Sequence, residues 1–465
     1  MKKKQILVFT LLISSLTLFA QTYITNVTLV DVEKQKLVPN QTVVISNDII
    51  SNIQKSNKIK IPENATIIDG TDKYLIPGLV DAHIHFFQNG GLYSRPDVID
   101  LTKHKSYNHE IALAKTDMET KLRRYLQNGI TTVIDVGANY QLLQQRKDFT
   151  DKKYSPTVYI TGPLLTTYKS KVYESLGENN PFALTKTIED GINAVKQQLQ
   201  YNPDFIKIWY IVGADGLSIE KSARKNLPII KAIIDEAHKN NLKIAVHATQ
   251  RITAQLAVEN GADFLVHSID DEILKDDFVQ LMKKKGTILC PSLTVNSKYL
   301  NTFGQNLKMT NYELKTADPF QLGSLLDLKH LSDSLLVEEY SKYGNSQESI
   351  SYLKQAESIS MKNMKILSDA GVLIATGTDA GNIGTLHTSS YLAELQAMHK
   401  GGMSNWQILQ ASTINGAKIF NKENEFGSVS IGKKANLVLL DANPVENIEN
   451  VTKINTVINK GGVFK

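Results

Sequence analysis

The run Pro77-Gly78-Leu79-Val80-Asp81-Ala82-His83-Ile84-His85 is largely apolar and ends in two histidines separated by one residue. In a β-strand, residues i and i+2 point to the same face. His83 and His85 can therefore bind one metal ion together. Taken alone, the His-x-His pattern is a weak signal, because an isolated histidine in a strand is more often an ordinary structural residue.

Strand-like runs of this kind recur along the chain, with stretches of helical periodicity between them. One such stretch is Pro228–Lys239, where the isoleucines fall on one face. Eight strands that alternate with helices predict an α/β fold, a (β/α)8 TIM barrel over residues 76–422. An open, doubly wound sheet is the alternative, although no glycine-rich phosphate loop follows a first strand. The eight runs are 77–85, 130–136, 157–161, 205–211, 243–247, 264–267, 287–292 and 373–378.

The two ends of the chain have a different pattern. Residues 21–75 contain short β-branched runs that are broken by Asn, Asp and Gln turns. Residues 423–465 contain similar runs at 435–441 and 454–458. Neither segment alone is large enough for a stable sandwich, so we expect both to form one small β-sandwich domain.

Histidine is scarce, and four of the ten histidines stand at the ends of predicted strands. Besides the first pair, His247 and His267 end the fifth and sixth runs, and Asp379 follows the eighth. The carboxyl ends of barrel strands form the mouth where active sites lie. Five ligand-type side chains therefore converge there and predict a metal site. Imidazole and carboxylate ligands suit zinc, and manganese, iron and cobalt stay open.

Lys207 is unusual because it interrupts the apolar run 205–211. Burying an ammonium group in such a strand is costly. A lysine at a strand end more often extends its charge into solvent. A lysine that carries a carboxylate, as a carbamate, would instead bridge two cations and remove the unfavourable charge.

Together these residues resemble the amidohydrolase superfamily. The run that ends in His83 and His85 resembles the opening of that family's barrel, and residues 427–441 look like its return into the β-sandwich. Asn436 stands where that returning segment usually has Asp. The branch that the chain resembles most is that of imidazolonepropionase-like and secreted prolidase-like enzymes. The family's remaining ligand positions are matched in order and approximate spacing by Lys207, His247, His267 and Asp379.

The resemblance implies an enzyme with two divalent metal ions, Zn2+ by its ligand types. A hydroxide shared between the ions would be the nucleophile, and Asp379 would be the catalytic base that passes its proton to the leaving nitrogen. The reaction would hydrolyse an amide or another carbon–nitrogen bond. One ion would be held by His83, His85 and Asp379, the other by His247 and His267, with carboxylated Lys207 as the bridge.

Three further residues are candidates for substrate binding. Arg251 is the one arginine of six that closely follows a ligand strand, and it would pair with a substrate carboxylate or cap the next helix. Tyr210 lies three residues past Lys207 and would reach a carboxylate or oxyanion, or pack at the barrel rim. His387 lies eight residues past Asp379, where we expect it to contact substrate or the transition-state oxygen.

The function that follows is that of an exported, metal-dependent hydrolase of a small molecule: a dipeptide, an Xaa-Pro dipeptide or an N-acyl amino acid. Hydrolysis of a cyclic amide, an imidazolone or a lactone is the enzymatic alternative. An alternative of another class is a non-catalytic periplasmic relative that binds a metal or a ligand. The long segment 296–349 predicts either a lid or a subunit contact, and the latter would make a homo-oligomer.

The start of the chain predicts export. Three lysines and a short apolar run make residues 1–20 a secretory signal peptide, because the run is shorter than a membrane span of about 20 residues. We therefore expect a periplasmic or secreted protein with no membrane attachment after cleavage. The single cysteine excludes an intramolecular disulfide framework. The net charge of +5 owes three units to this leader, so nucleic acid is not an expected partner.

Overall fold

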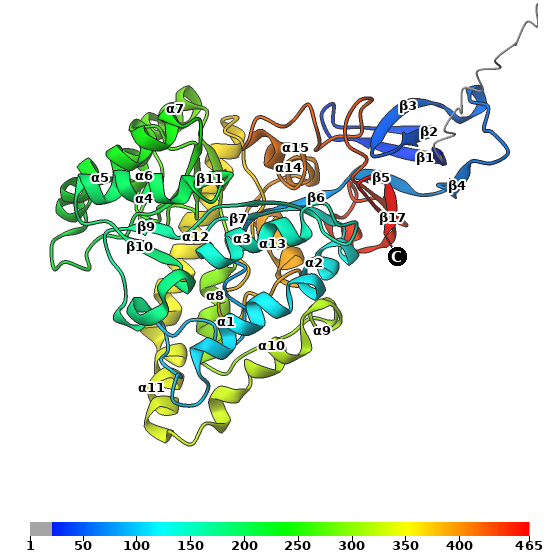
Figure 1. Ribbon diagram of the computed structural model, residues 1–465. Coiled ribbons are helices and arrows are strands. Elements are labelled where there is room, and N and C mark those ends of the chain that lie inside the picture. The colour runs from blue at the N-terminus through cyan, green and yellow to red at the C-terminus, as the bar shows by residue number, and fades with distance from the viewer. Residues whose placement is uncertain (1–20, 465) are drawn as a thin grey trace, which may run out of the picture.

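The computed structural model describes residues 21–464, so the predicted signal peptide lies outside the described residues. Strands from both ends of this range form one eight-stranded sheet in the order β17-β16-β15-β5-β1-β2-β3, with β4 paired to β1. The sheet lies at one end of the molecule, where blue and red strands meet (Figure 1). Its strands are β1 (Gln21–Asp31), β2 (Lys36–Ser46), β3 (Ile49–Lys55), β4 (Thr66–Asp69), β5 (Tyr74–Pro77), β15 (Leu437–Leu440), β16 (Ile454–Asn459) and β17 (Gly462–Phe464).

This sheet has a core that draws on both chain ends. Ile24 and Val43 from the first end share a buried cluster with Leu437 and Ile458 from the second. Strand β5 pairs antiparallel with β15 and parallel with β1, so the sheet is continuous across the two segments. The domain boundaries at 75/76 and 422/423, and the packing of the sheet as a sandwich, stay predictions.

The middle of the chain contains parallel strands. They form a three-stranded sheet, β6-β7-β8, and a six-stranded sheet, β10-β9-β11-β12-β13-β14. Seven of the eight predicted runs contain one of these strands. The strands are β6 (Leu79–Ile84), β7 (Ile130–Asp135), β8 (Thr157–Ile160), β9 (Leu164–Thr166), β10 (Phe182–Leu184), β11 (Phe205–Trp209), β12 (Lys243–His247), β13 (Phe264–Val266) and β14 (Ile288–Cys290).

The eighth run, 373–378, joins the outer strands of these two sheets. On one side, the N–H of Ala375 donates to the carbonyl of Leu289 in β14 at 2.8 Å. On the other side, the N–H of Ala82 in β6 donates to the carbonyl of Thr376, also at 2.8 Å. Parallel bridges Leu289–Ile374 and Ile84–Ala380 accompany these bonds. The eighth run therefore connects the last strand of the series to the first.

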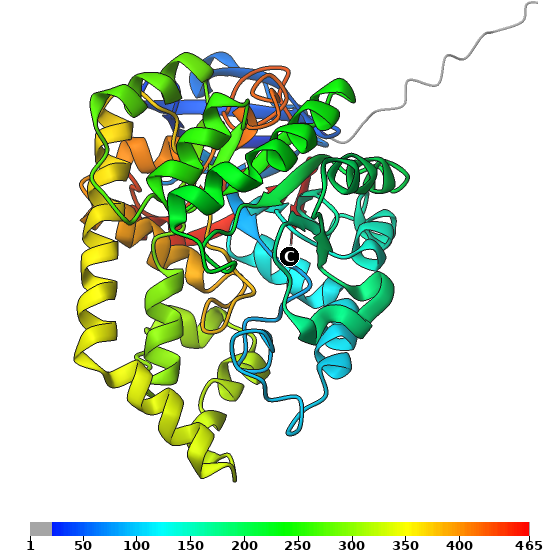
Figure 2. The same cartoon turned by 90° about the vertical axis from the view of Figure 1, so that its left-hand side faces the viewer.

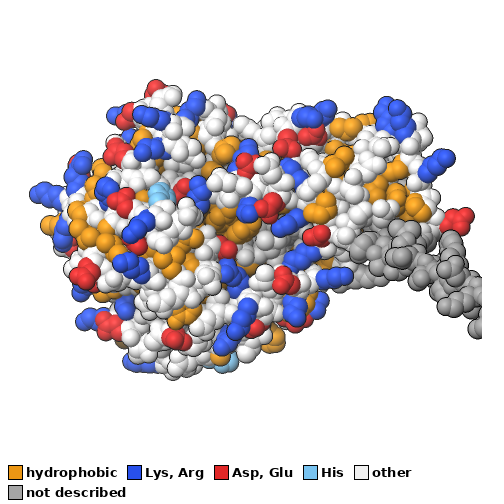
Figure 3. Space-filling model, turned by 45° about the horizontal axis from the view of Figure 1, so that its top comes forward, with side chains coloured by type: hydrophobic (Ala, Val, Ile, Leu, Met, Phe, Trp, Pro, Cys, Tyr) orange, Lys and Arg blue, Asp and Glu red, His pale blue; other side chains and the backbone are white. Residues whose placement is uncertain are grey.

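Helices cover the parallel strands, and Figures 1 and 2 show a helical arm, α9 to α12, that extends to one side. Among the described residues, no helix is both long and apolar enough to cross a membrane. On the face in Figure 3, basic and acidic side chains are interspersed. The α-helices are α1 (Tyr107–Thr116), α2 (Met118–Gln127), α3 (Tyr140–Phe149), α4 (Ile188–Leu199), α5 (Ile219–Lys239), α6 (Arg251–Glu259), α7 (Asp276–Lys285), α8 (Val295–Phe303), α9 (Asn311–Thr316), α10 (Pro319–Ser324), α11 (Ser334–Asn345), α12 (Gln347–Asp369), α13 (Ser390–Lys400), α14 (Asn405–Ala411) and α15 (Ile414–Lys418). Short 3-10 helices are η1 (Ser56–Lys58), η2 (Lys171–Asn179), η3 (Asp327–His330) and η4 (Ile448–Thr452).

Helix α5 is longer than its apolar pattern predicts. It begins at Ile219, where the Ser218 side chain accepts from the N–H of Lys221 and caps the first turn. Pro228 thus lies inside the helix, whereas the sequence places it at the start. The predicted apolar face is buried, since Ile230 and Ile233 are both at most 1% exposed.

Gly78 joins the two parts of the fold, because it stands between β5 and β6. A Cβ at this position would lie 2.0 Å from Oγ1 and 2.5 Å from Cγ2 of Thr131. Gly78→Ala should therefore lower the melting temperature by about 3 °C or more, since overpacking costs about 1–3 kcal/mol. Gly323→Ala is the matched control, because a Cβ there meets nothing within 4 Å. Equal melting temperatures of the two variants in a circular dichroism melt would contradict this account.

Candidate active site

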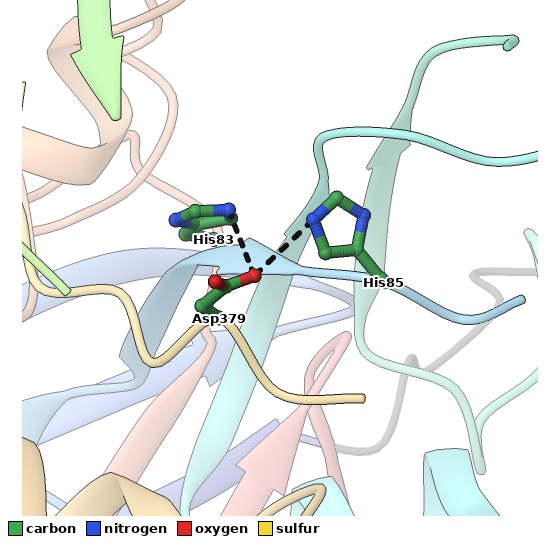
Figure 4. Close-up of side chains that lie close together, drawn as sticks. All are labelled: His83, His85 and Asp379. Carbon is green, nitrogen blue, oxygen red and sulfur yellow. Dashed lines mark ion pairs between the residues drawn. The ribbon is translucent and has the colours of Figure 1, made fainter. Parts of the chain in front are cut away.

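Two histidines and one aspartate form the centre of the site. His83 and His85 stand at the end of β6, and Asp379 follows the eighth run. Oδ1 of Asp379 lies 3.1 Å from Nε2 of His83 and 3.2 Å from Nε2 of His85 (Figure 4). These three residues are the one group in the described chain whose ligand atoms are close enough to hold a metal ion, all within 4.8 Å of one another.

Hydrogen bonds at the far ring nitrogens orient both imidazoles. Nδ1 of His85 lies 3.1 Å from the carbonyl oxygen of Gly137, to which its N–H donates. Nδ1 of His83 lies 2.7 Å from Oγ of Ser292. A donor at Nδ1 leaves the Nε2 lone pair free to bind a metal, as in most protein metal sites.

The backbone around Asp379 is fixed by contacts with the first strand. The N–H of Asp379 donates to the carbonyl of His83 at 2.6 Å, and Oγ1 of Thr378 donates to Oδ2 of Asp81 at 2.8 Å. Asp379 has a φ of 60° and His267 a φ of 73°, both in the left-handed region that non-glycine residues rarely adopt. Such strain persists where the surrounding structure enforces it, and it is concentrated at functional sites.

The remaining predicted ligands reach the same place from neighbouring strands. Nε2 of His267 lies 3.7 Å from Oδ2 of Asp379, and the rings of His247 and His267 are 4.4 Å apart. Lys207 lies in β11, which pairs in register with the strand that carries His247. Its side chain is almost fully buried, at 1% exposed. The structure thus brings all six predicted metal ligands to one cavity.

Burial sets the charge of this cluster. It lowers the pKa of His83 to about 3 and that of His267 to about 4, so both imidazoles are neutral at pH 7. Burial also lowers the pKa of Lys207 to about 7, although the charge of Asp379 acts in the opposite direction. Burial would raise the pKa of Asp379, but His83, His85 and His267 together hold it well below its usual value, so the carboxylate is ionised.

These residues fit a divalent metal ion. Nε2 of His83 and Oδ1 of Asp379 are buried, and neither has a hydrogen-bond partner among the described residues. Buried polar atoms of native proteins normally have partners, so two such atoms 3.1 Å apart indicate a missing ligand. Neutral imidazoles with a carboxylate are a donor set that zinc and related ions accept.

The site opens into a cavity of about 1160 Å³. Parts of α8, α11 and α12 line it, so the predicted lid segment 296–349 contributes directly to the cavity wall. Gln88 also lines it and is 2% exposed, yet its Oε1 has no hydrogen-bond partner within the described range. An ordered water or a bound molecule would supply the donor that this buried acceptor needs.

The three predicted substrate residues do not line this cavity, and each has a partner elsewhere. The hydroxyl of Tyr210 donates to the carbonyl of Ala223 at 2.6 Å. Arg251 lies over the ring of Phe278, 4.3 Å from its centre, and Nη2 is 3.2 Å from Oδ2 of Asp277. His387 is buried between the Tyr125 hydroxyl, at 2.8 Å, and the Gln88 carbonyl, at 2.9 Å. The geometry therefore gives these side chains packing and orienting roles.

Sequence reasoning missed Arg95, the arginine that does line the cavity. Its Nε and Nη2 donate to the two oxygens of Asp97 at 2.8 and 2.7 Å, and Nη1 donates to the Tyr299 hydroxyl at 3.1 Å and to Asn382. Asn382 in turn donates to the carbonyl of Asp379 at 3.1 Å. No pattern marks Arg95 in the sequence, because it stands in a loop ten residues past His85. Asn382 could have been found, as a polar residue just after a strand end.

This network predicts opposite outcomes for two arginines. Arg95→Lys should lower kcat/KM about tenfold, because lysine cannot bind Asp97 with two nitrogens while also reaching Tyr299. Arg251→Lys should change kcat/KM less than about twofold, because this side chain lies outside the cavity wall. Steady-state kinetics on the best peptide or amide substrate checks both variants. A larger loss for Arg251→Lys than for Arg95→Lys would refute the assignment.

Comparison with known proteins agrees with this geometry. Residues 74–463 match the model of the Amidohydrolase family, so the chain belongs to this family of metal-dependent hydrolases. It is accordingly an enzyme that acts on carbon–nitrogen bonds, and its fold is the α/β barrel of that family.

Individual known proteins match this chain either over a short stretch or at a low sequence identity. The chain is 33% identical to 5'-deoxyadenosine deaminase of Methanobrevibacter smithii over 103 residues, which are 21% of this chain and only 24% of that relative. It is 21% identical over 443 residues to the imidazolonepropionase of Alkaliphilus metalliredigens, covering 89% of this chain and 86% of the relative. A solved Xaa-Pro dipeptidase with bound methionine superimposes with a TM-score of 0.70 at 20% identity, covering 96% of this chain and 100% of that one.

Proposed function

We propose that this protein hydrolyses the amide bond of a small peptide-like substrate, a dipeptide, an Xaa-Pro dipeptide or an N-acyl amino acid. The observation that carries the proposal is the convergence of His83, His85 and Asp379 in the wall of a cavity of about 1160 Å³. A cavity of this size accommodates a whole dipeptide and its side chains. The similarity in fold to an Xaa-Pro dipeptidase supports this substrate class.

The proposed cofactor is a pair of Zn2+ ions. When bound, such ions supply Lewis acidity for the substrate carbonyl and lower the pKa of water. Lys207 would bridge them as a carbamate, which requires a neutral amine, and the lowered pKa of about 7 makes that form accessible. Carboxylation also replaces a buried cation by an anion among metal ligands, which removes the cost of the buried ammonium. One ion would be held by His83, His85 and Asp379, and the other by His247 and His267.

Asp379 is the proposed catalytic base. Its Oδ1 faces both His83 and His85, whereas Oδ2 lies on the side of His267. Oδ2 can therefore accept the proton of the attacking water and return it to the leaving nitrogen. The backbone bond from Asp379 N–H to the His83 carbonyl holds the backbone of Asp379 against the end of β6.

Hydrolysis of a cyclic amide such as an imidazolone is the second candidate. It is favoured by the similarity to imidazolonepropionase, which extends over 89% of this chain. We also propose that residues 1–20 direct export to the periplasm or the exterior, on the basis of their three lysines and apolar run. Small peptides from outside the cell are a natural substrate for an exported enzyme, whereas imidazolones arise inside it.

A substrate panel tests the proposed reaction. The zinc-loaded enzyme without residues 1–20 should release amino acids from Xaa-Pro or other dipeptides, or from N-acyl amino acids, and chelation should abolish release. Asp379→Asn should lower kcat about 10³-fold or more, because it removes both a ligand and the proton acceptor. His330→Ala, an exposed position on η3, should leave kcat unchanged. Cleavage of an imidazolone with no cleavage of any linear amide would exclude the first candidate in favour of the second.

A further inference from the structure

Helix α13 carries a fully buried carboxyl group, Glu394, that no step of the proposed reaction uses. The residue is 0% exposed, and the described residues offer it no ion-pair partner within 4.0 Å. Burial raises the pKa of Glu394 to about 8, although its hydrogen bonds with Leu293 and Thr294 act in the opposite direction. Burying a carboxyl group without a cation is costly, so Glu394 depends on the hydrogen-bond donors around it.

Three donors from the loop after β14 meet this carboxyl group. Oε1 of Glu394 accepts from the N–H of Leu293 at 2.8 Å. Oε2 accepts from both the N–H and the hydroxyl of Thr294, each at 3.2 Å. The Thr294 side chain makes no capping bond to α8 and is directed at Glu394 instead. The carboxyl group therefore fixes the main chain of two consecutive residues.

The residue before these two is Ser292, which contacts a predicted metal ligand. Its Oγ lies 2.7 Å from Nδ1 of His83. Ser292 has a φ of 48°, in the left-handed region that non-glycine residues rarely adopt. Such a conformation persists where neighbouring contacts enforce it. The bonds from Leu293 and Thr294 to Glu394 hold the chain directly after this strained residue.

Helix α13 is also attached to the strand that ends at His83. The hydroxyl of Tyr391, one turn before Glu394, donates to the carbonyl of Val80 in β6 at 2.8 Å. Residues three apart on a helix lie on the same face. One face of α13 is therefore bonded both to β6 and to the loop after β14, and it sets the position of Ser292 relative to His83.

The contact between Ser292 and His83 needs such an attachment, because the eighth run lies between β14 and β6. A Cβ on Gly377 in this run would lie 2.3 Å from Sγ of Cys290 and 2.7 Å from Cβ of His83, so the three segments approach closely. The hydrogen bond between Ser292 and His83 thus crosses a strand. Direct pairing of β14 with β6 does not set its length.

We propose that Glu394 is a positioning residue of the metal centre, which holds residues 292–294 so that the Ser292 hydroxyl fixes the ring of His83 with Nε2 toward the ion. The Nδ1–H of His83 then donates to Ser292, and the Nε2 lone pair stays free. The inference rests on metal binding by His83, as in the proposed function, and not on the proposed substrate. It gives α13 an effect on metal affinity, whereas a merely structural carboxyl group would affect stability alone.

The zinc affinity of three variants tests this proposal, by titration of the metal-free protein with Zn2+ against a chromophoric chelator. Glu394→Gln keeps the size of the side chain but replaces one acceptor oxygen by an NH2 group. The zinc dissociation constant should therefore rise about tenfold. Ser292→Ala should raise it by a similar factor. Because both residues act through one contact, the double variant should bind zinc no more than about threefold more weakly than either single variant.

Glu313→Gln is the matched control. Glu313 is also a buried glutamate, 5% exposed, and it accepts from the N–H of Thr310 at 2.9 Å in the cap of α9. Its substitution should lower the melting temperature of the metal-free protein by about 2 °C and leave the zinc dissociation constant within about twofold. If Glu394→Gln does not fold, Thr294→Ala removes a single donor to Glu394 and should raise the constant about threefold.

Two outcomes would overturn the proposal. One is a zinc dissociation constant that stays within about twofold in Glu394→Gln or, if that variant does not fold, in Thr294→Ala. The other is a loss of about 100-fold in the double variant, since independent tenfold effects multiply. An unmodified protein that binds no zinc would contradict the metal centre itself, and this inference with it. If the variants respond as predicted but no amide is cleaved, the proposed substrate fails and the role of Glu394 stands.

Discussion

One backbone hydrogen bond holds the predicted ligands of the first and last barrel strands together: the N–H of Asp379 donates to the carbonyl of His83 at 2.6 Å. This bond exists because the eighth run pairs with β6 on one side and β14 on the other. The first and last strands of the series therefore meet, and each contributes ligands where it ends. Asp81 strengthens the junction by accepting from the hydroxyl of Thr378 at 2.8 Å. A buried site whose predicted ligands, His83 and Asp379, are 296 residues apart in sequence depends on this closure.

The closure also explains the electrostatics of the site. Because the ligands are buried together, the imidazoles of His83 and His267 are neutral at pH 7 and Lys207 has a lowered pKa of about 7. The carboxylate of Asp379, whose side chain is 7% exposed, lies within 3.7 Å of the Nε2 atoms of three histidines. Such an arrangement is costly for the protein alone and becomes favourable with a divalent cation. The cost of building the site is thus one reason to expect that metal binding stabilises the fold.

The inner part of the site could be predicted from the sequence, and the outer part could not. His83, His85, His247 and His267 terminate apolar runs, and strand ends of a barrel must face one mouth, so their meeting follows from periodicity. Arg251 fitted the same rule, yet the start of α6 directs its side chain outward onto Phe278. The position of a side chain on the first turn of a helix depends on the exact helix start, which periodicity does not fix.

The cavity wall is a second case in which the periodicity of the sequence does not fix which side chains face the site. The length of segment 296–349 predicts a functional insertion, and the structure places α8 and α11 against the site. Which residues of that insertion face inward depends on how several short helices pack, and no strand register constrains them. Arg95 and Tyr299 are therefore visible only in three dimensions.

Elemental analysis of metal content tests the central claim most directly, with the zinc-loaded enzyme compared with Lys207→Met. Methionine fills the same buried space without an amine that could be carboxylated. The account predicts about two metal ions per chain in the unmodified enzyme and about one or fewer in the variant, at a similar melting temperature of the metal-free forms. One ion per chain in both proteins would show that Lys207 bridges nothing, and would contradict the binuclear site.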